Sequence, residues 1–180
     1  FFSDELNRLE RRGPWPISVI VIDVNNLKLT NDENGHAGGD AQLRRLGEVL
    51  RKAVERPATA SRIGGDEFAL LLPATDARGA EHLIDQLHEL IAVNNQFHGG
   101  IPLSVSIGRA TSQDGERLEQ LVHRADQEMY NAKRRHWRRS KLLAARCPTR
   151  RRKAAWLPGD HRGSRQGSAP ARRPTASHCR

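Results

Sequence analysis

The hydrophobic pattern predicts four strands in the first two thirds of the chain. Residues 17–24 form a nearly continuous β-branched run, which is typical of a central strand buried on both faces. Two further apolar runs, residues 59–63 and 68–72, flank a short turn with two glycines, and this arrangement predicts a β-hairpin. Residues 103–107 alternate apolar residues with serine, as a half-exposed strand does.

Helical periodicity completes the predicted fold. Apolar residues recur three or four positions apart in four segments: residues 1–12, 41–56, 78–93 and 117–133. The resulting order after the first helix, β-αα-β-β-α-β-α, predicts an α/β sandwich (α+β) with a mostly antiparallel central sheet and flanking helices. Residues 25–39 carry turn formers and few apolar side chains, so we expect a loop there, where phosphates could meet backbone N–H groups.

Carboxylates stand at the ends of two predicted strands. Asp23 lies near the end of the buried run, where a carboxylate is costly unless it is paired or bound to a metal ion. Asp66 and Glu67 are adjacent at the hairpin tip, and a divalent cation between them would relieve their repulsion. The glycines before them, Gly64 and Gly65, allow another group to approach the backbone closely. Taken alone, the hairpin could equally be a solvated acidic turn.

Charge divides the chain into two parts. The 180 residues carry a formal net charge of +9, but residues 1–132 hold 14 Lys and Arg against 20 Asp and Glu, a net charge of −6. Residues 133–180 hold 16 Lys and Arg against one acid, Asp160, a net charge of +15. An Arg-rich segment of this kind predicts salt-sensitive association with any duplex. No base-reading motif is present, so we expect no specific nucleic-acid partner.

Cysteine and hydropathy indicate the compartment. Cys147 and Cys179 both fall in the basic quarter, so the folded part is expected to contain neither a disulfide framework nor a Cys-based zinc site. The sequence has no signal peptide and no apolar run near the ~20 residues of a membrane span. These features predict a cytoplasmic protein, or the cytoplasmic part of a membrane sensor.

Six blocks of residues, taken in order, resemble the GGDEF domains, the bacterial diguanylate cyclases. The central block is Gly-Gly-Asp-Glu-Phe, residues 64–68. The others are residues 23–28, 31–32, 35–40, 104–108 and 125–133. Five letters alone would be weak evidence, but the set in this order and spacing is highly specific. The resemblance covers residues 1–135 and implies the palm-like fold of nucleotide cyclases.

The resemblance implies a metal-dependent reaction in which two GTP molecules condense to cyclic di-GMP and two pyrophosphates. Each domain of a homodimer would hold one GTP together with Mg²⁺ or Mn²⁺. The metal ligands implied are Asp23, the Val24 carbonyl, Asp66 and Glu67. One of the two hairpin acids would also assist deprotonation of the 3′-hydroxyl, and the sequence leaves open which one.

The resemblance also implies a set of substrate-binding residues. Asn31 and Asp40 match the guanine-reading positions, and Lys133 matches a phosphate-binding lysine. Gly64 and Gly65 match positions where the backbone approaches the nucleotide. Simpler roles are also open: Asn31 and Asp40 could be loop or helix-cap residues, and Asp23 of the metal set could cap a turn after its strand.

Several positions depart from the family pattern. The inhibitory product site should be Arg-x-x-Asp, but residues 55–58 read Glu-Arg-Pro-Ala, so we expect no tight feedback inhibition. Trp137 stands where a second phosphate-contacting basic residue belongs. The segment that normally precedes the first helix is missing, which suggests a lost upstream sensory region. Residues 136–180 contain no closing strand, and we consider two explanations: a disordered basic tail or a shifted reading frame. An alternative function is therefore a catalytically impaired domain that binds GTP as a regulatory module.

Overall fold

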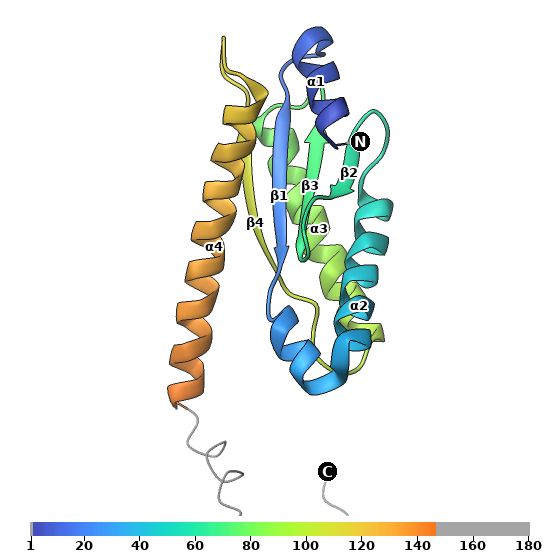
Figure 1. Cartoon of the computed structure of the whole chain (residues 1–180), viewed down its shortest axis with the longest axis vertical. Helices are drawn as coiled ribbons and strands as arrows, with labels where there is room; N and C mark the ends of the chain where they lie inside the picture. Colours follow the sequence, from blue (N-terminus) through green and yellow to red (C-terminus); the bar gives the residue numbers. More distant parts are fainter. Residues whose placement is uncertain (1, 147–180) are drawn as a thin grey trace, which may run out of the picture.

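The computed structural model describes residues 2–146 of the chain, drawn in colour in Figure 1. Helices and strands are mixed along this part of the sequence, with two strands, β2 and β3, following each other directly. In chain order they are α1 (Phe2–Arg12), β1 (Ser18–Val24), α2 (Leu27–Ala53), β2 (Thr59–Arg62), β3 (Glu67–Leu72), α3 (Ala77–Phe97), β4 (Val105–Thr111) and α4 (Leu118–Arg146).

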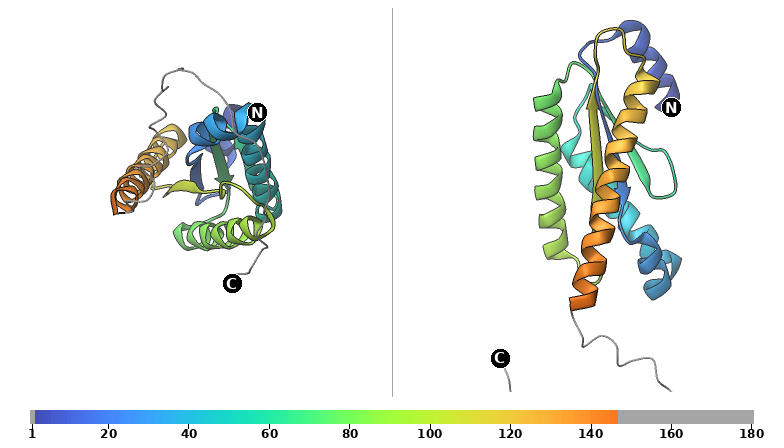
Figure 2. Two further views of the ribbon diagram at one scale, coloured as in Figure 1. Left: turned by 90° about the horizontal axis from the view of Figure 1, so that it is seen from below. Right: turned by 90° about the vertical axis from the view of Figure 1, so that its left-hand side faces the viewer.

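The four strands of the described chain form one sheet in the order β2-β3-β1-β4, and every neighbouring pair is antiparallel. The predicted β-hairpin is β2-β3, and β1 is a central strand. Helices cover both faces: seen along the sheet in Figure 2, α2 and α3 lie on one side and α4 on the other. This is the α+β palm-like architecture that the sequence predicts.

Two apolar cores lie on opposite faces of the sheet because side chains alternate along each strand. Ile20, Ile22 and Val24 of β1 point into the core formed with α2 and α3. Val19 and Val21 point into the core formed with α1 and α4. The periodicity therefore also sets the direction of Asp23, which faces α4.

Helix α4 packs directly on the backbone of β4, and this contact depends on Gly108. A Cβ atom at Gly108 would overlap the backbone of α4 at Ala125, Glu128 and Met129. Glycine here is therefore required by close approach of two main chains rather than by an unusual backbone angle. The contact fixes the distance of α4 from the sheet.

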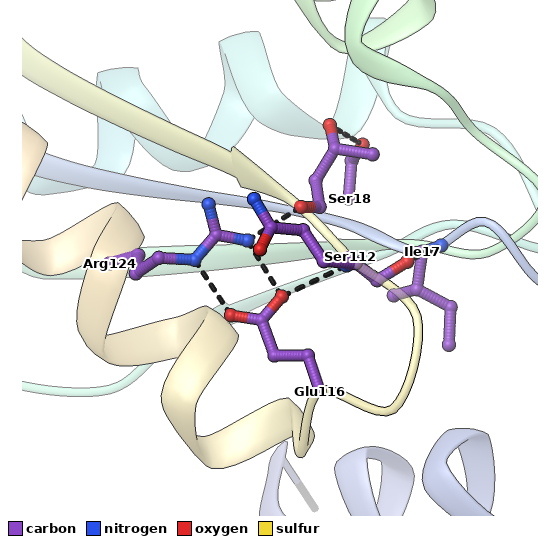
Figure 3. A network of polar contacts seen from close by, with 7 residues as sticks. Ile17, Ser18, Ser112, Glu116 and Arg124 are labelled. Atoms are coloured by element: carbon purple, nitrogen blue, oxygen red, sulfur yellow. Dashed lines mark hydrogen bonds and ion pairs between the residues drawn. The ribbon is translucent and has the colours of Figure 1, made fainter.

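An ion pair stabilises the loop that connects β4 and α4. Arg124 of α4 contacts the Glu116 carboxylate through two nitrogens at 2.7 Å, and donates a third bond of 2.6 Å to the Thr111 carbonyl (Figure 3). Glu116 also accepts a hydrogen bond from the backbone N–H of Gln113. These bonds hold the start of α4 against the end of β4.

The expectation of a loop over residues 25–39 is wrong. The chain becomes helical at Leu27, and α2 continues through a kink at Gly35, where φ is 70° and ψ is 174°. Buried Thr30 stabilises this region because its hydroxyl is the donor to two acceptors, the Gln42 side-chain oxygen at 3.0 Å and the Asn26 carbonyl at 3.2 Å. These polar contacts stabilise a helix that the apolar pattern does not reveal.

Three predicted boundaries also change. Strand β4 runs from Val105 to Thr111 rather than over residues 103–107, and buried residues at 106, 108 and 110 continue the alternation past Ile107. Helix α3 continues to Phe97. Helix α4 continues to Arg146, although the sequence predicted the loss of regular structure near Arg134. Its last turns extend beyond the sheet (Figure 1).

The two explanations for the basic tail concern mostly residues 147–180, which lie outside the described residues, as do both cysteines. Within residues 2–146, no helix has both the length and the apolar character needed to cross a bilayer.

Candidate active site

The ends of β1 and β3 bring the predicted acids to one edge of the sheet. Asp23 and Glu67 are direct cross-strand partners, so their side chains leave the same face of the sheet. The backbone N–H of Val24 donates a 3.0 Å hydrogen bond to the carbonyl of Asp66. This bond attaches the hairpin tip to the end of the central strand. The tertiary structure thus places all three acids around one strand end.

Lys133 of α4 reaches this edge from the face of the sheet toward which Asp23 points. Its ammonium lies 2.6 Å from Oδ2 of Asp23 and 3.8 Å from Oδ2 of Asp66. The Asp23 side chain is 2% exposed, whereas the side chains of Lys133 and Asp66 are 37% and 39% exposed. Oδ1 of Asp23 is buried and accepts no hydrogen bond from the described residues. One cation is therefore shared by two of the predicted metal ligands.

The pKa values of Asp23 and Lys133 are both shifted by their contact and by burial. Burial raises the pKa of Asp23 above its ordinary value, against the hydrogen bond and positive charge of Lys133, which lower it. Burial by itself would lower the pKa of Lys133, but the hydrogen bond to Asp23 and the charges of Asp23, Asp66 and Glu67 outweigh it and raise this pKa. The two shifts are compatible because Asp23 is buried more deeply than Lys133. The site favours a cation beside Asp23.

Arg62 shapes the hairpin tip. Its guanidinium donates hydrogen bonds to the carbonyls of Gly64 and Gly65, at 3.2 and 2.6 Å. The backbone N–H groups of Ile63 and Gly64 both donate to the Glu67 carbonyl. A Cβ on Gly64 would come within 2.7 Å of Oε2 of Glu67, whereas a Cβ on Gly65 would meet no described atom within 4 Å. A side chain on Gly64 would therefore displace the Glu67 carboxylate, the flexible end of that side chain, and Gly65 is open to an incoming group.

The residues at this edge fit a divalent cation in their chemistry. Carboxylate oxygens are the preferred ligands of Mg²⁺, and the unpaired Oδ1 of Asp23 offers one in a buried position. The ammonium of Lys133 already offsets part of the negative charge of Asp23 and Asp66. No three Asp, Glu, His or Cys side chains within residues 2–146 form a ready metal centre. Metal binding at this edge would therefore require the Lys133 side chain to move.

The two predicted guanine readers lie on α2, on either side of the Gly35 kink. Asn31 packs against Gly39, and its Oδ1 contacts the position that a Cβ on Gly39 would fill. This oxygen is buried and has no hydrogen-bond partner among the described residues. Asp40 directly follows Gly39 and is exposed. The kink thus brings Asn31 beside the backbone that carries Asp40, with the Asn31 oxygen buried and unpaired and the Asp40 side chain exposed.

Sequence reasoning missed the role of Asn25. This residue is buried, and its amide donates to the Ser104 hydroxyl at 3.1 Å while its Oδ1 accepts from the Ser106 hydroxyl at 2.8 Å. Its backbone N–H donates to the Ser104 carbonyl. Asn25 thereby joins the end of β1 to the start of β4. The sequence did contain a signal for this role: Asn25 is a polar residue close to the end of the continuous apolar run of β1.

Four antiparallel strands with helices on both faces, and acids at one strand end, define a palm-like α+β domain. Comparison with known families identifies it: the sequence model described as "Diguanylate cyclase, GGDEF domain" matches residues 1–139. The chain belongs to the GGDEF domain family.

Curated relatives carry the same domain within longer proteins. The diguanylate cyclase DgcP of Pseudomonas aeruginosa is 36% identical over 134 residues, which cover 73% of this chain and 20% of that protein. The diguanylate cyclase DgcS of Shewanella oneidensis is 33% identical over 123 residues, covering 68% of this chain and 41% of that protein. The chain therefore spans less than half of these relatives.

Solved structures agree on the fold. The active GGEEF domain of a diguanylate cyclase from Vibrio cholerae is 30% identical, with a TM-score of 0.65, and the match covers 73% of this chain and 85% of that one. An EAL/GGDEF domain protein from M. capsulatus is 39% identical, with a TM-score of 0.62, covering 74% and 88%.

Proposed function

We propose that this domain is a diguanylate cyclase that condenses two GTP molecules into cyclic di-GMP and releases two pyrophosphates. The observation that carries the proposal is a pair of carboxylates at the end of the central strand. Asp23 and Asp66 lie on either side of the Lys133 ammonium there. Family membership supports the reaction class, since curated relatives are named diguanylate cyclases.

Asp23, Asp66, Glu67 and the Val24 carbonyl would hold Mg²⁺ or Mn²⁺. A bound divalent ion would acidify the attacking hydroxyl and neutralise charge on the phosphates. With Asp23 and Asp66 engaged by a metal ion, the ammonium of Lys133 would be free to contact a phosphate. Lys133 would thus exchange one anionic partner for another without leaving the site.

Asn31 and Asp40 would select guanine. Asp40 can accept hydrogen bonds from N1–H and the exocyclic amino group of guanine, and adenine offers no equivalent pair of donors. The unpaired Oδ1 of Asn31 supports this role, because a buried amide oxygen gains stability when a donor reaches it.

Gly64 and Gly65 would let the phosphates approach the hairpin backbone. The reaction transfers the α-phosphorus of each GTP to the 3′-oxygen of the other, so the hydroxyl loses a proton and pyrophosphate leaves with the former bonding electron pair. Either Asp66 or Glu67 would receive that proton. Because each domain holds one nucleotide, two copies must face each other, and catalysis depends on positioning and charge neutralisation.

The test is direct. The purified chain is incubated with GTP and MgCl₂, and cyclic di-GMP and pyrophosphate are quantified by chromatography and mass spectrometry. We expect product in the wild type and a loss of at least about a hundredfold in Asp23→Asn, because a metal ligand is removed. Asp85→Asn, an exposed carboxylate on α3, serves as the control. Equal rates for Asp23→Asn and wild type would refute the assigned site.

A second function, GTP binding without turnover, is favoured by one observation. The described residues form no ready metal centre, and Lys133 holds two of the proposed ligands. Such a regulatory module would bind GTP in a calorimetric titration but form no cyclic di-GMP, with either Mg²⁺ or Mn²⁺ present. Product formation excludes this alternative.

A further inference from the structure

The C-terminal half of α4 carries an exposed row of aromatic and basic side chains. Tyr130 and Trp137 are 58% and 60% exposed. With Arg134, Arg138 and Lys141 they form what we call the aromatic–basic stripe. Their spacing keeps all five on one side of a helix with 3.6 residues per turn. With Lys133, the stripe lines a shallow hollow of about 460 Å³.

The two rings of the stripe do not contribute to the core. The inward side of α4 is formed by other residues, among them Leu121, Ala125 and Met129. Each exposed ring instead has a cation over its face: the Arg134 guanidinium lies 6.0 Å from the Tyr130 centroid, and the Lys141 ammonium lies 4.5 Å from the Trp137 centroid. A single exposed aromatic needs no explanation. Two in one row, each beside a cation, indicate a binding surface.

Charge limits the class of partner. Residues 133–146 hold seven Lys and Arg and no Asp or Glu, whereas residues 1–132 carry a net charge of −6. The five exposed cations between residues 134 and 141 therefore stand together on the outside of an acidic domain. A surface of this kind complements a polyanion.

The aromatic rings favour single-stranded nucleic acid over an anionic membrane surface as the partner. A membrane-bound helix needs a continuous apolar face. The exposed leucines of α4, Leu142 and Leu143, are consecutive and so point roughly 100° apart, and neither lies in the stripe. Flat rings alternating with cations instead match the stacked bases and phosphates of a single strand. Tyr130 and Trp137 are seven residues apart, about 10 Å along the helix, so the two rings accommodate two different bases.

We propose that the aromatic–basic stripe of α4 binds single-stranded nucleic acid without sequence preference. Bases stack on Tyr130 and Trp137, and Arg134, Arg138 and Lys141 contact the phosphodiester backbone. The stripe includes none of the acids at the strand ends. Binding by the stripe requires no cyclase reaction, although the stripe shares its hollow with Lys133 of the proposed active site.

Fluorescence anisotropy of the full chain with labelled oligo(dT) of about 20 nucleotides tests the proposal. We expect the double variant Tyr130→Ala/Trp137→Ala to bind at least about tenfold more weakly, because it removes both surfaces on which bases stack. Its salt dependence should equal that of the wild type, since no charge is removed. Trp15→Ala, an exposed tryptophan outside α4, is the matched control and should bind normally.

A second double variant tests the contribution of the cations of the stripe to binding. Arg134→Gln/Lys141→Gln should lower the slope of log affinity against log salt by about 1.4, which is about 0.7 for each phosphate that the variant no longer neutralises. Arg51→Gln/Lys52→Gln on α2 removes the same charge elsewhere and should leave the slope nearly unchanged. Basic residues after Arg146 are common to all variants, so the difference between a variant and its matched control is assigned to the stripe.

Three results would overturn the proposal. One is equal affinity of the Tyr130→Ala/Trp137→Ala variant and wild type. Another is tighter binding to a duplex of the same length. The third is stronger, ring-dependent binding to phosphatidylcholine vesicles with about 30% phosphatidylserine, which would assign the stripe to a membrane surface. Circular dichroism of each variant confirms that α4 remains folded.

Discussion

The ammonium of Lys133 bridges the carboxylates of Asp23 and Asp66, at 2.6 and 3.8 Å, across 110 residues of sequence. A cation is therefore part of the strand-end site in the folded domain itself. A divalent ion proposed for the same acids would have to compete with this lysine.

Replacing Lys133 by methionine should make the fold more dependent on metal. In EDTA we expect the free energy of unfolding of Lys133→Met to fall by about 1–3 kcal/mol, because Asp23 is left buried without its cation. The partial exposure of Lys133 limits this loss. Added Mg²⁺ should then raise the Tm of the variant more than that of the wild type. Lys28→Met, an exposed site on α2, is the control. Identical Mg²⁺ responses in the variant and the wild type would show that metal and lysine do not share these acids.

Replacing Asn31 by alanine should weaken nucleotide selection rather than the fold. Oδ1 of Asn31 has no hydrogen-bond partner among the described residues, so its loss breaks no intramolecular bond to that atom. We expect about tenfold weaker binding of a non-hydrolysable GTP analogue and unchanged binding of the ATP analogue, measured by calorimetry. Asn34→Ala, an exposed residue on the same helix, should bind both normally. An equal loss for both nucleotides would argue against guanine recognition.

Replacing Gly108 by alanine should destabilise the domain severely. Its methyl group would overlap the backbone of α4 at Ala125 and Met129, which cannot move as a side chain can. We expect a loss of at least about 3 kcal/mol in urea denaturation, or failure to fold. Gly47→Ala is a control with the opposite expected sign. Gly47 lies inside α2, and a Cβ there meets no described atom within 4 Å. We expect this variant to gain about 0.5–1 kcal/mol in the free energy of unfolding. Similar stabilities for Gly108→Ala and wild type would contradict the close packing.

The ion pair of Glu116 and Arg124 should make stability depend on pH in the acid range. The Arg124 hydrogen bonds lower the pKa of Glu116 below its ordinary value; burial acts against this effect, and the Gln113 N–H adds to it. A lowered folded-state pKa means that the contribution is present above the ordinary glutamate pKa of roughly 4.3 and is lost as pH falls through the folded-state value.

Glu116→Gln removes this titration. We expect the variant to be about 1–2 kcal/mol less stable at neutral pH, with a smaller difference from wild type at low pH. Urea titrations across the acid range measure the difference. Glu119→Gln, one turn along and exposed, should behave as wild type. A constant gap at every pH would mean that Glu116 contributes by packing and not by charge.

The elements predicted most accurately are those in which a local pattern reports burial. The β-branched run of β1 and the hairpin β2-β3 were predicted within a residue or so, because strand side chains alternate between two apolar cores. The extension of α4 past Lys133 was missed for the same reason. Those turns are exposed, so no burial pattern marks them, although arginine, lysine, leucine and alanine all favour a helix.

The sequence by itself determined the strands, the family blocks and the identities of the acids at the two strand ends. Only the tertiary structure decided which atoms meet: Lys133 with Asp23, Asn25 with Ser104 and Ser106, and α4 with Gly108. The physical reason is distance along the chain. Periodicity arises from neighbours a few residues apart, whereas the candidate site is built by strand register and helix packing that join positions up to 110 residues apart.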